Sequence, residues 1–251
     1  MDRQQPQWLQ FADLLYIELL NWRWGWRPLV LTGILLPVIS IVLLGYIAGP
    51  GVEASRYAHI LTGNVTVALI FTNMRRVSTR LSWMRDVGTL DYYGTLPVRH
   101  YFVVLSVLCA FFLLSLPSFL ATLFFGAVFL DITLQIHPLV IGIVPLAALS
   151  LAGLGAYVGV VSRNSEEVQT YNQTLLFLFL VLGPVMIPSE NLPNLMRIIG
   201  WFNPATYGAS ALRHVLLGPL TTRVWLDIAL LLGLAAVSLF FVDRKIASMN
   251  R

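Results

Sequence analysis

The chain has 251 residues, of which 57% are hydrophobic and 11% are charged, and its mean hydropathy is +0.77. A soluble domain carries about 25% charged residues, so the composition excludes a soluble globular domain and predicts an all-α, polytopic membrane protein. The net charge of +4 comes from arginine, with a single lysine, and in a membrane protein such an excess marks cytoplasmic loops and not a nucleic-acid partner.

Residues 1–28 form the first predicted unit, a helix over 8–26 that lies on the cytoplasmic membrane surface. Large apolar side chains recur there every three or four residues, which places them on one helical face. They are Trp8, Phe11, Leu15, Leu19, Trp22 and Trp26. Tryptophan favours the membrane interface, and Pro28 ends the predicted helix. The alternative is a cytoplasmic extension of the first span, because Leu14, Ile17 and Leu20 blur the polar face.

Residues 29–251 form a predicted transmembrane domain with six apolar stretches, since a spanning helix needs roughly 20 residues. The stretches cover residues 29–49, 57–74, 101–129, 138–161, 169–187 and 224–242. The second and the fifth are near the short limit. The third is long and contains Pro117, where we expect a tilt or a kink. An even number of spans places both termini on the same side.

The basic residues predict which side that is. With the N-terminus in the cytoplasm, twelve basic residues fall on inner segments and four on outer segments, as expected from the excess of Lys and Arg on cytoplasmic loops. The outer four are Arg56, Arg197, Arg213 and Arg223. The predicted location is the bacterial inner membrane, with a membrane of bacterial descent in an organelle as the alternative, and both termini are cytoplasmic.

The cytoplasmic loop over residues 75–100 is long for a connection between spans. It combines five arginines with Asp86 and Asp91 and with Trp83, Tyr92 and Tyr93. A short helix over residues 83–93 is predicted, followed by a turn at Pro97. Tyr, Trp and Arg are favoured at protein interfaces, so the loop is interpreted as a docking surface. An anchor for lipid headgroups explains the same residue types equally well.

The outer segment over residues 188–222 is interrupted by prolines although it lies between two apolar stretches. Between Leu182 and Gly218, the four prolines Pro184, Pro188, Pro193 and Pro204 remove backbone donors and break helices. Irregular backbone at membrane depth is tolerated only where protein or a water-filled cavity shields it. We therefore predict one or two short helices that dip back into the bilayer, as in proteins that serve transport. Glu190 is expected to pair with Arg197 or Arg213, because uncompensated charge there is costly.

Catalytic and metal-binding patterns are missing from the sequence. It has no GxxxxGK[ST] loop, so nucleotide is not bound in the P-loop manner, and its four histidines and single cysteine show no metal-ligand spacing. No cofactor is expected on this chain. No charged residue is central in a predicted span, which argues against a proton-coupled or ion-coupled transporter and favours a protein that receives its energy from another source. Gly155 and Gly159 form a GxxxG pattern that favours tight helix packing, although glycines at this spacing also arise by chance.

Three motifs resemble one family of membrane proteins. The first is Arg85-Asp86-Val87-Gly88-Thr89-Leu90-Asp91, followed by Leu96-Pro97-Val98. The second runs from Leu154 to Gln169. The third runs from Gly183 to Gly218 and contains Pro188, Asn191, Leu192, Pro193, Asn203, Pro204, Tyr207, Leu212 and Arg213. Together they are similar to the permease subunits of ABC-type-2 exporters, the ATP-binding-cassette transporters of the daunorubicin-resistance, polysaccharide and nodulation-factor export type.

The resemblance implies a half-transporter that carries a lipid-like, glycan-lipid or amphipathic drug-like cargo. Two six-span permeases, identical or different, would pair in the lipid bilayer, and each would dock one separate ATPase subunit that binds ATP and Mg. The family's coupling helix would contain Arg85, Asp86, Gly88, Thr89, Leu90 and Asp91. The outer re-entrant helices would be Glu190–Trp201 and Pro204–Leu217. Asp86 and Asp91 stand where glutamate is commoner in the family.

Two other functions remain open at this level. An integral-membrane lipid-modifying enzyme needs acids or histidines gathered near one interface, and Glu190, His214 and Asp227 are the loose candidates. A non-catalytic membrane scaffold needs neither proline-broken helices nor a docking loop. A neighbouring gene for an ATPase with a Walker A motif would favour export over both.

Overall fold

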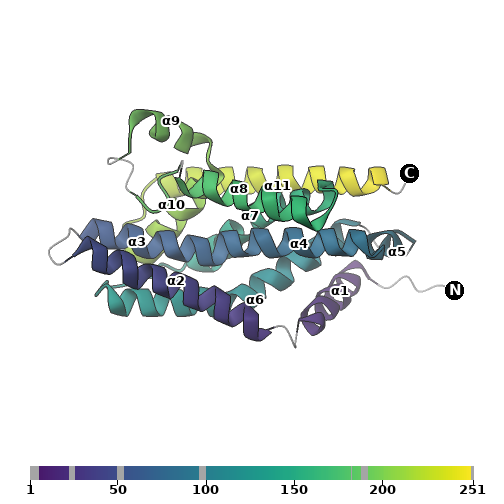
Figure 1. Ribbon diagram of the computed structural model, residues 1–251, viewed down its shortest axis with the longest axis horizontal. Coiled ribbons are helices and arrows are strands. Elements are labelled where there is room, and N and C mark those ends of the chain that lie inside the picture. The colour runs from purple at the N-terminus through teal and green to yellow at the C-terminus, as the bar shows by residue number, and fades with distance from the viewer. Residues whose placement is uncertain are drawn as a thin grey trace.

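The computed structural model describes residues 6–22, 26–49, 54–95, 100–181, 183–187 and 192–249, and this part of the chain is a helical bundle without strands (Figure 1). Its elements are α1 (Gln7–Asn21), α2 (Trp26–Ala48), α3 (Ala54–Thr66), η1 (Val67–Phe71), α4 (Thr72–Asp86), α5 (Thr89–Thr95), α6 (His100–Phe129), α7 (Val140–Val161), α8 (Ser165–Val181), α9 (Asn194–Phe202), α10 (Pro204–Leu217) and α11 (Arg223–Met249).

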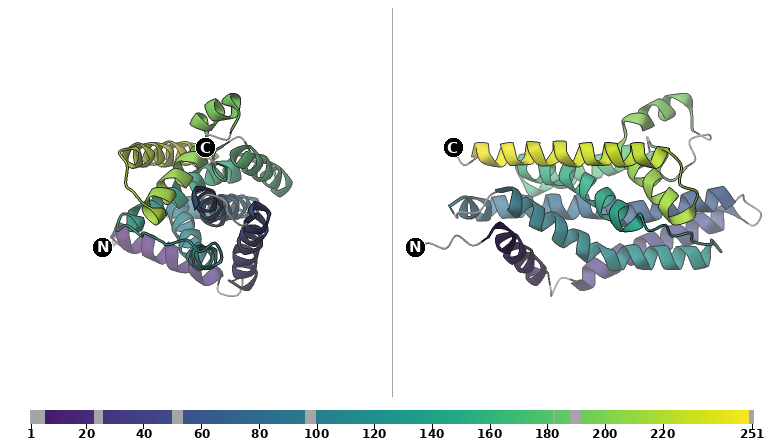
Figure 2. Two further views of the ribbon diagram at one scale, coloured as in Figure 1. Left: turned by 90° about the vertical axis from the view of Figure 1, so that its left-hand side faces the viewer. Right: turned by 180° about the vertical axis from the view of Figure 1, so that it is seen from behind.

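Each of the six predicted apolar stretches lies mainly on a helix, but the fifth extends past the end of α8 at Val181 into residues 183–187, which are not helical. Within the described residues, three helical segments are long and apolar enough to cross a membrane, namely Tyr101–Phe129, Val140–Val161 and Arg223–Ile246, and Gly33–Ile47 is a shorter apolar helix. α6 continues through Pro117 without ending there. The N- and C-terminal ends of the described chain lie at the same end of the bundle as α5, whereas α9, α10 and the start of α3 lie at the other (Figures 1 and 2).

The second apolar stretch is longer as a helix than the sequence indicates. α3, η1 and α4 follow one another without a break from Ala54 to Asp86, so residues 75–86 are helical and not loop. The short helix predicted over 83–93 is wrong in its bounds, because the chain turns at Val87 and Gly88 and α5 begins at Thr89. The arginine-rich sequence continues this helix because Arg is a good helix former. Of these arginines Arg75 is exposed, whereas Arg76 is buried.

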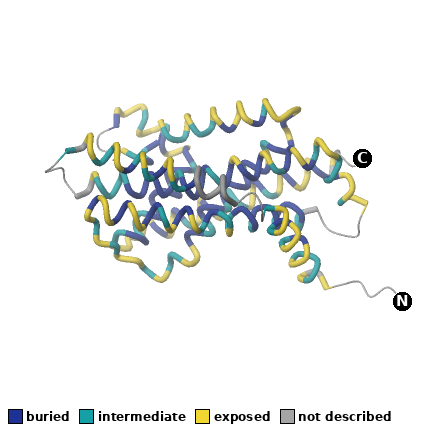
Figure 3. The backbone as a smooth tube through the Cα atoms, turned by 60° about the horizontal axis from the view of Figure 1, so that its bottom comes forward, coloured by how far each residue is buried: buried dark blue, intermediate teal, exposed yellow. Residues whose placement is uncertain are grey.

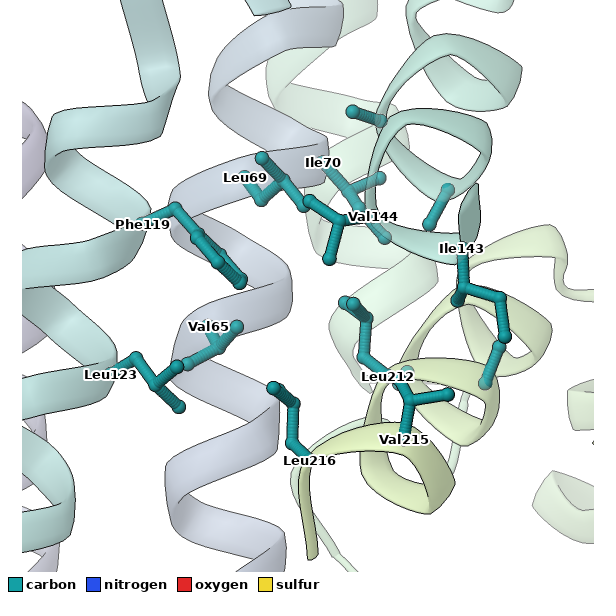
Figure 4. Close-up of a cluster of buried hydrophobic side chains, with 14 of the residues drawn as sticks. Val65, Leu69, Ile70, Phe119, Leu123, Ile143, Val144, Leu212, Val215 and Leu216 are labelled. Atoms are coloured by element: carbon teal, nitrogen blue, oxygen red, sulfur yellow. The ribbon is translucent and has the colours of Figure 1, made fainter. Parts of the chain in front are cut away.

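The bundle is held together by one large apolar cluster at its centre. Buried side chains from η1, α6, α7 and α10 meet there, among them Ile70, Phe119, Ile143 and Leu212 (Figure 4). Buried residues concentrate inside the bundle and exposed ones on its outer side (Figure 3). α10 contributes a nearly continuous buried surface to this cluster because small residues, Ala205, Gly208 and Ala209, let it approach its neighbours.

α4 and α7 pack backbone to backbone through the GxxxG pattern. A Cβ atom added at Gly155 would lie 2.2 Å from the carbonyl oxygen of Met74, and one at Gly159 would lie 2.3 Å from that of Ser78. Both acceptors are one helical turn apart on α4, so the two glycines form a flat strip against which α4 lies. This contact joins the helix that leads to α5 to the centre of the bundle.

α1 differs in part from its predicted form. It ends at Asn21, and Trp26 already belongs to α2, so residues 8–26 are not one helix. Its most buried residues are Leu14 and Glu18, while Trp8 is exposed. The predicted apolar face is therefore rotated toward Glu18, because that carboxylate finds a partner on α4 and can be buried with it.

Candidate functional site

The turn between α4 and α5 is built on a glycine. Gly88 has φ +73°, a left-handed conformation that L side chains rarely adopt. Its amide donates to the carbonyl of Arg85 at 3.0 Å, and the amide of Val87 donates to Trp83 at 3.0 Å. These bonds end α4 in the manner of a helix C-cap, and the amide of Tyr92 donates to the carbonyl of Gly88 to start α5.

Among the predicted coupling residues, Arg85 and Leu90 attach the turn to the bundle. The Arg85 guanidinium lies 2.7 Å from Asp86 Oδ1, and it also donates to the carbonyl oxygen of Gly159 at the C-terminal end of α7. A cation there is favoured by the partial negative charge of the helix end. Leu90 is buried in a second apolar cluster with Val77, Leu81 and Met84 of α4. These two side chains hold the turn rigidly in place.

Other residues of the turn face outward. Trp83, Asp86, Val87, Asp91 and Tyr92 are exposed, and they lie on the last turns of α4 and on α5; we call this set the α4–α5 surface. It combines two carboxylates with two aromatic rings and one aliphatic side chain. Thr89 and Gly88 are half-buried between this surface and the bundle. Such a mixture on a rigid, exposed turn suits the docking of a protein partner.

α1 is tied to α4 next to this surface. Glu18, which is 3% exposed, accepts two hydrogen bonds from Arg80 at 2.8 and 3.0 Å. The same Arg80 guanidinium lies over the Trp83 ring, 4.7 Å from its centre. Burial, followed by the nearby Glu18 carboxylate, raises the pKa of Tyr93 on α5. A movement of α4 is thus transmitted to α1 through a bidentate, largely buried ion pair.

The start of α8 completes this end of the bundle. The side chain of Asn164 accepts from the Glu167 amide at 2.8 Å, and Glu167 reaches back to the Arg163 amide, which is a reciprocal N-terminal cap. The Glu167 carboxylate also accepts a hydrogen bond from the Tyr171 hydroxyl at 2.8 Å. The acidic loop before α8 is therefore an ordered, negatively charged surface near Arg85.

The outer segment contains two helices, as predicted, with α10 at the predicted bounds. The first helix begins later than predicted, at Asn194 and not at Glu190, and Pro193 stands directly before its first residue. The side chain of Asn203 accepts from the Ala205 amide at 3.0 Å and donates to the carbonyl of Phe179 at 2.7 Å. Asn203 thus caps α10 and joins it to α8, and Pro204 fits the first helical position since it lacks an amide hydrogen.

The two outer helices have different surroundings. α10 is embedded in the bundle, whereas α9 projects from it with exposed apolar side chains at Leu195, Ile198, Trp201 and Phe202 (Figure 1). Leu192, before α9, is buried, and the Tyr207 hydroxyl of α10 donates to the carbonyl of Trp201, which holds α9 against α10. An exposed apolar face on a short helix is typical of a segment at the membrane interface.

Arg213 of α10 binds neutral oxygens. Its guanidinium donates to Thr62 Oγ1 at 3.1 Å and to the carbonyl of Val185 at 3.3 Å. Glu190, one of the residues expected to pair with Arg213 or Arg197, lies outside the described residues. Asp227 of α11, which is fully buried, lies within electrostatic reach of Arg213, His214 and Arg223. The sequence placed Asp227 just inside the last span without indicating this burial.

A cleft of about 400 Å³ opens between α2, the η1–α4 helix and α8. Leu36, Val67 and Phe71 line its apolar part, and Arg75, Thr79, Asn172 and Gln173 line its polar part. α2 and α8 flank the helix of α3 and α4 on this side of the molecule (Figure 2). The π-helical η1 stands at the cleft, and π-bulges are frequent at functional sites.

Sequence reasoning did not single out the polar pairs beneath this cleft. Asn73 Nδ2 donates to Ser115 Oγ at 2.9 Å, and Asn172 Nδ2 donates to Ser78 Oγ at 2.6 Å. All four residues are buried. Asparagine within an apolar stretch was the available signal, because a buried amide needs a partner. Within the described ranges, no three residues among His, Cys, Asp and Glu gather as a metal site.

The ABC-2 type transporter family model matches residues 10–217, which include α1, the α4–α5 surface, the cleft and both outer helices. The chain belongs to the ABC-2 type transporter family. The permease is also similar to the daunorubicin resistance ABC transporter permease protein DrrB1 of Streptomyces coeruleorubidus, with 25% identity over 215 residues, 81% of this chain and 72% of that protein.

Family membership and the apolar helices make the permease an integral membrane protein and the membrane subunit of an ABC transporter. Permeases of this family lack an ATPase site of their own and work with an ATP-binding subunit. This assignment favours export over the lipid-modifying enzyme and the scaffold that the sequence left open.

Proposed function

We propose that the permease is one half of an ATP-binding-cassette exporter that crosses the bacterial inner membrane six times. The spans are α2, the continuous α3–η1–α4 helix, α6, α7, α8 and α11, with the re-entrant α10 between the last two. The position of both described chain ends beside α5 supports cytoplasmic termini (Figure 1). The twelve-to-four distribution of basic residues supports the same orientation.

An ATPase subunit that binds ATP and Mg docks on the α4–α5 surface in this proposal, and two ATPases act on two permeases. One observation supports it above all: the α4–α5 surface stands at the end of the same unbroken helix that lines the cleft. Force applied at Asp86 therefore reaches Phe71 and Thr72 along one continuous helix, and force applied to α5 reaches α4 through Leu90. Rigid-body movement of packed helices is a common way of switching.

The translocation pathway forms where the clefts of two permease copies face each other. α2 and α8 leave the η1–α4 helix uncovered on this side, so a second copy can complete the wall. A lining with both apolar side chains and Arg75, Asn172 and Gln173 suits an amphipathic, lipid-like, glycan-lipid or drug-like cargo. The daunorubicin-resistance relative supports a drug-like cargo.

The deciding experiment is reconstitution of the permease and its ATPase in liposomes. We expect ATP-dependent movement of a fluorescent amphipathic cargo, and we expect no movement with ADP or with the permease alone. A Gln173→Trp variant, whose ring fills the cleft, should slow this movement several-fold while the two subunits still co-purify. Movement that continues without the ATPase would contradict the proposal.

The orientation is tested by thiol labelling in a Cys109→Ala background. A cysteine at the exposed Asn194 should react with an impermeant maleimide added to intact cells, and one at the exposed Thr95 should react only in inverted vesicles. Thr95 is a better inner reporter than Ser78, which is fully buried and bonded to Asn172. Labelling with the two sides exchanged would overturn the orientation.

A further inference from the structure

A pocket of about 510 Å³ lies between α9, α10 and the start of α11. Arg197 and Arg223 supply two cationic side chains to its wall, and Trp201 and Tyr207 supply aromatic ones. Thr206, also in the wall, carries a buried hydroxyl without a hydrogen-bond partner among the described residues. An unsatisfied buried hydroxyl is costly, so a ligand oxygen that reaches it is favoured. The lining suits an anion.

The charges around this pocket also favour an anionic ligand. α11 begins at Arg223, and its first turn contains no acidic residue, so the partial positive charge of the helix end is not compensated there. Arg213 lies within electrostatic reach of Arg223. Asp227 opposes these charges, but it is fully buried and is not among the residues that line the pocket. Arg197 and Arg223 therefore give the pocket wall a cationic character.

A second pocket, of about 380 Å³, adjoins the first one and is apolar. Both pockets share Trp201 and Tyr207, and the second one follows α11 from Ala229 to Val237. The distance along α11 from Leu226 to Val237 is roughly 17 Å at 1.5 Å per residue. This length is comparable to one leaflet of the hydrocarbon core, about 15 Å. A cationic pocket is thus continuous with an apolar groove of acyl-chain length.

We propose that the two pockets together bind one anionic phospholipid of the membrane. Its phosphate lies between Arg197 and Arg223 near the start of α11, and one acyl chain lies in the groove along α11 past Gly233. Arg binds phosphate through several hydrogen bonds at once, while the exposed apolar face of α9 keeps the site open to the bilayer. The assignment of this lipid to the outer leaflet rests on the proposed orientation of the permease. The assignment of the binding site does not depend on that orientation.

Native mass spectrometry of the complete detergent-solubilised permease tests this site. The probes are phosphatidylglycerol, phosphatidylcholine and inorganic phosphate at equal concentrations. We expect phosphatidylglycerol to be retained about tenfold better than phosphatidylcholine, and inorganic phosphate not to displace it. The double variant R197Q/R223Q should lose this preference, whereas R56Q, which removes an exposed arginine from α3, should keep it.

The groove has its own test. A Cβ atom added at Gly233 would meet no atom within 4 Å, so the leucine of Gly233→Leu can extend into the groove without forcing the backbone to move. We expect this variant to retain phosphatidylglycerol several-fold less well at an unchanged melting temperature. Equal retention of both lipids by the wild type, or displacement by free phosphate, would overturn the lipid site. Because no ATPase is present, the outcome does not depend on transport.

Discussion

Reversing the charge of Asp86 is expected to abolish binding of the ATPase while the permease still folds. Asp86 is exposed at the end of α4, and its one resolved partner is the neighbouring Arg85. Arg85 keeps its bonds to Ser82 and to the end of α7 when that carboxylate is lost. Truncating one member of a charge pair in an interface typically costs about 2–5 kcal/mol. We therefore expect Asp86→Arg to reduce the ATPase that co-purifies with the permease by thirtyfold or more, since about 1.4 kcal/mol is tenfold.

The matched control for this variant is Asp243→Arg. Asp243 is also exposed, on the last turns of α11, so the substitution changes the net charge equally at a residue that is not part of the α4–α5 surface. It should leave ATPase co-purification unchanged. Gly88→Pro tests the turn itself, because proline fixes φ near −65° and Gly88 needs φ +73°. If Asp86→Arg and Gly88→Pro both retain the ATPase fully, the docking surface lies elsewhere.

Adding one methyl group at Gly155 is expected to destabilise the whole bundle. The new Cβ would stand 2.2 Å from the Met74 carbonyl oxygen, and backbone atoms cannot move aside as a flexible side chain can. Overpacking of this kind costs about 1–3 kcal/mol, and separating α4 from α7 adds lost contacts along both helices. We expect Gly155→Ala to lower the melting temperature in detergent by several degrees and Gly155→Leu to abolish the folded peak on size exclusion.

Gly142 provides the control on the same helix. Its added Cβ would meet no atom within 4 Å, so Gly142→Ala should leave the melting temperature unchanged or slightly higher. Gly159→Ala, which meets the Ser78 carbonyl at 2.3 Å, should reproduce the Gly155 effect. An unchanged melting temperature for both Gly155→Ala and Gly159→Ala would show that the two helices are not held at this distance.

The sequence alone determined the class of this protein and the positions of its apolar helices. Hydropathy and the spacing of prolines depend on short segments, and for that reason α10 has its predicted bounds and most of each apolar stretch is helical, although the fifth stretch extends past the end of α8. Local preferences of this kind need no knowledge of what lies opposite each segment. The turn at Gly88 was missed, because the helix predicted over 83–93 runs through this residue, whereas its left-handed conformation ends α4 there.

Only the tertiary structure decided which polar groups meet. Glu18 on α1 and Arg80 on α4 are 62 residues apart, and Asn172 and Ser78 are 94 apart, so neither pair has a sequence pattern. The same holds for the lipid groove, in which α9, α10 and α11 each supply one wall. In an apolar chain most residue types satisfy the membrane equally well. The choice among arrangements therefore rests on a few close backbone contacts and buried hydrogen bonds, which become visible only in three dimensions.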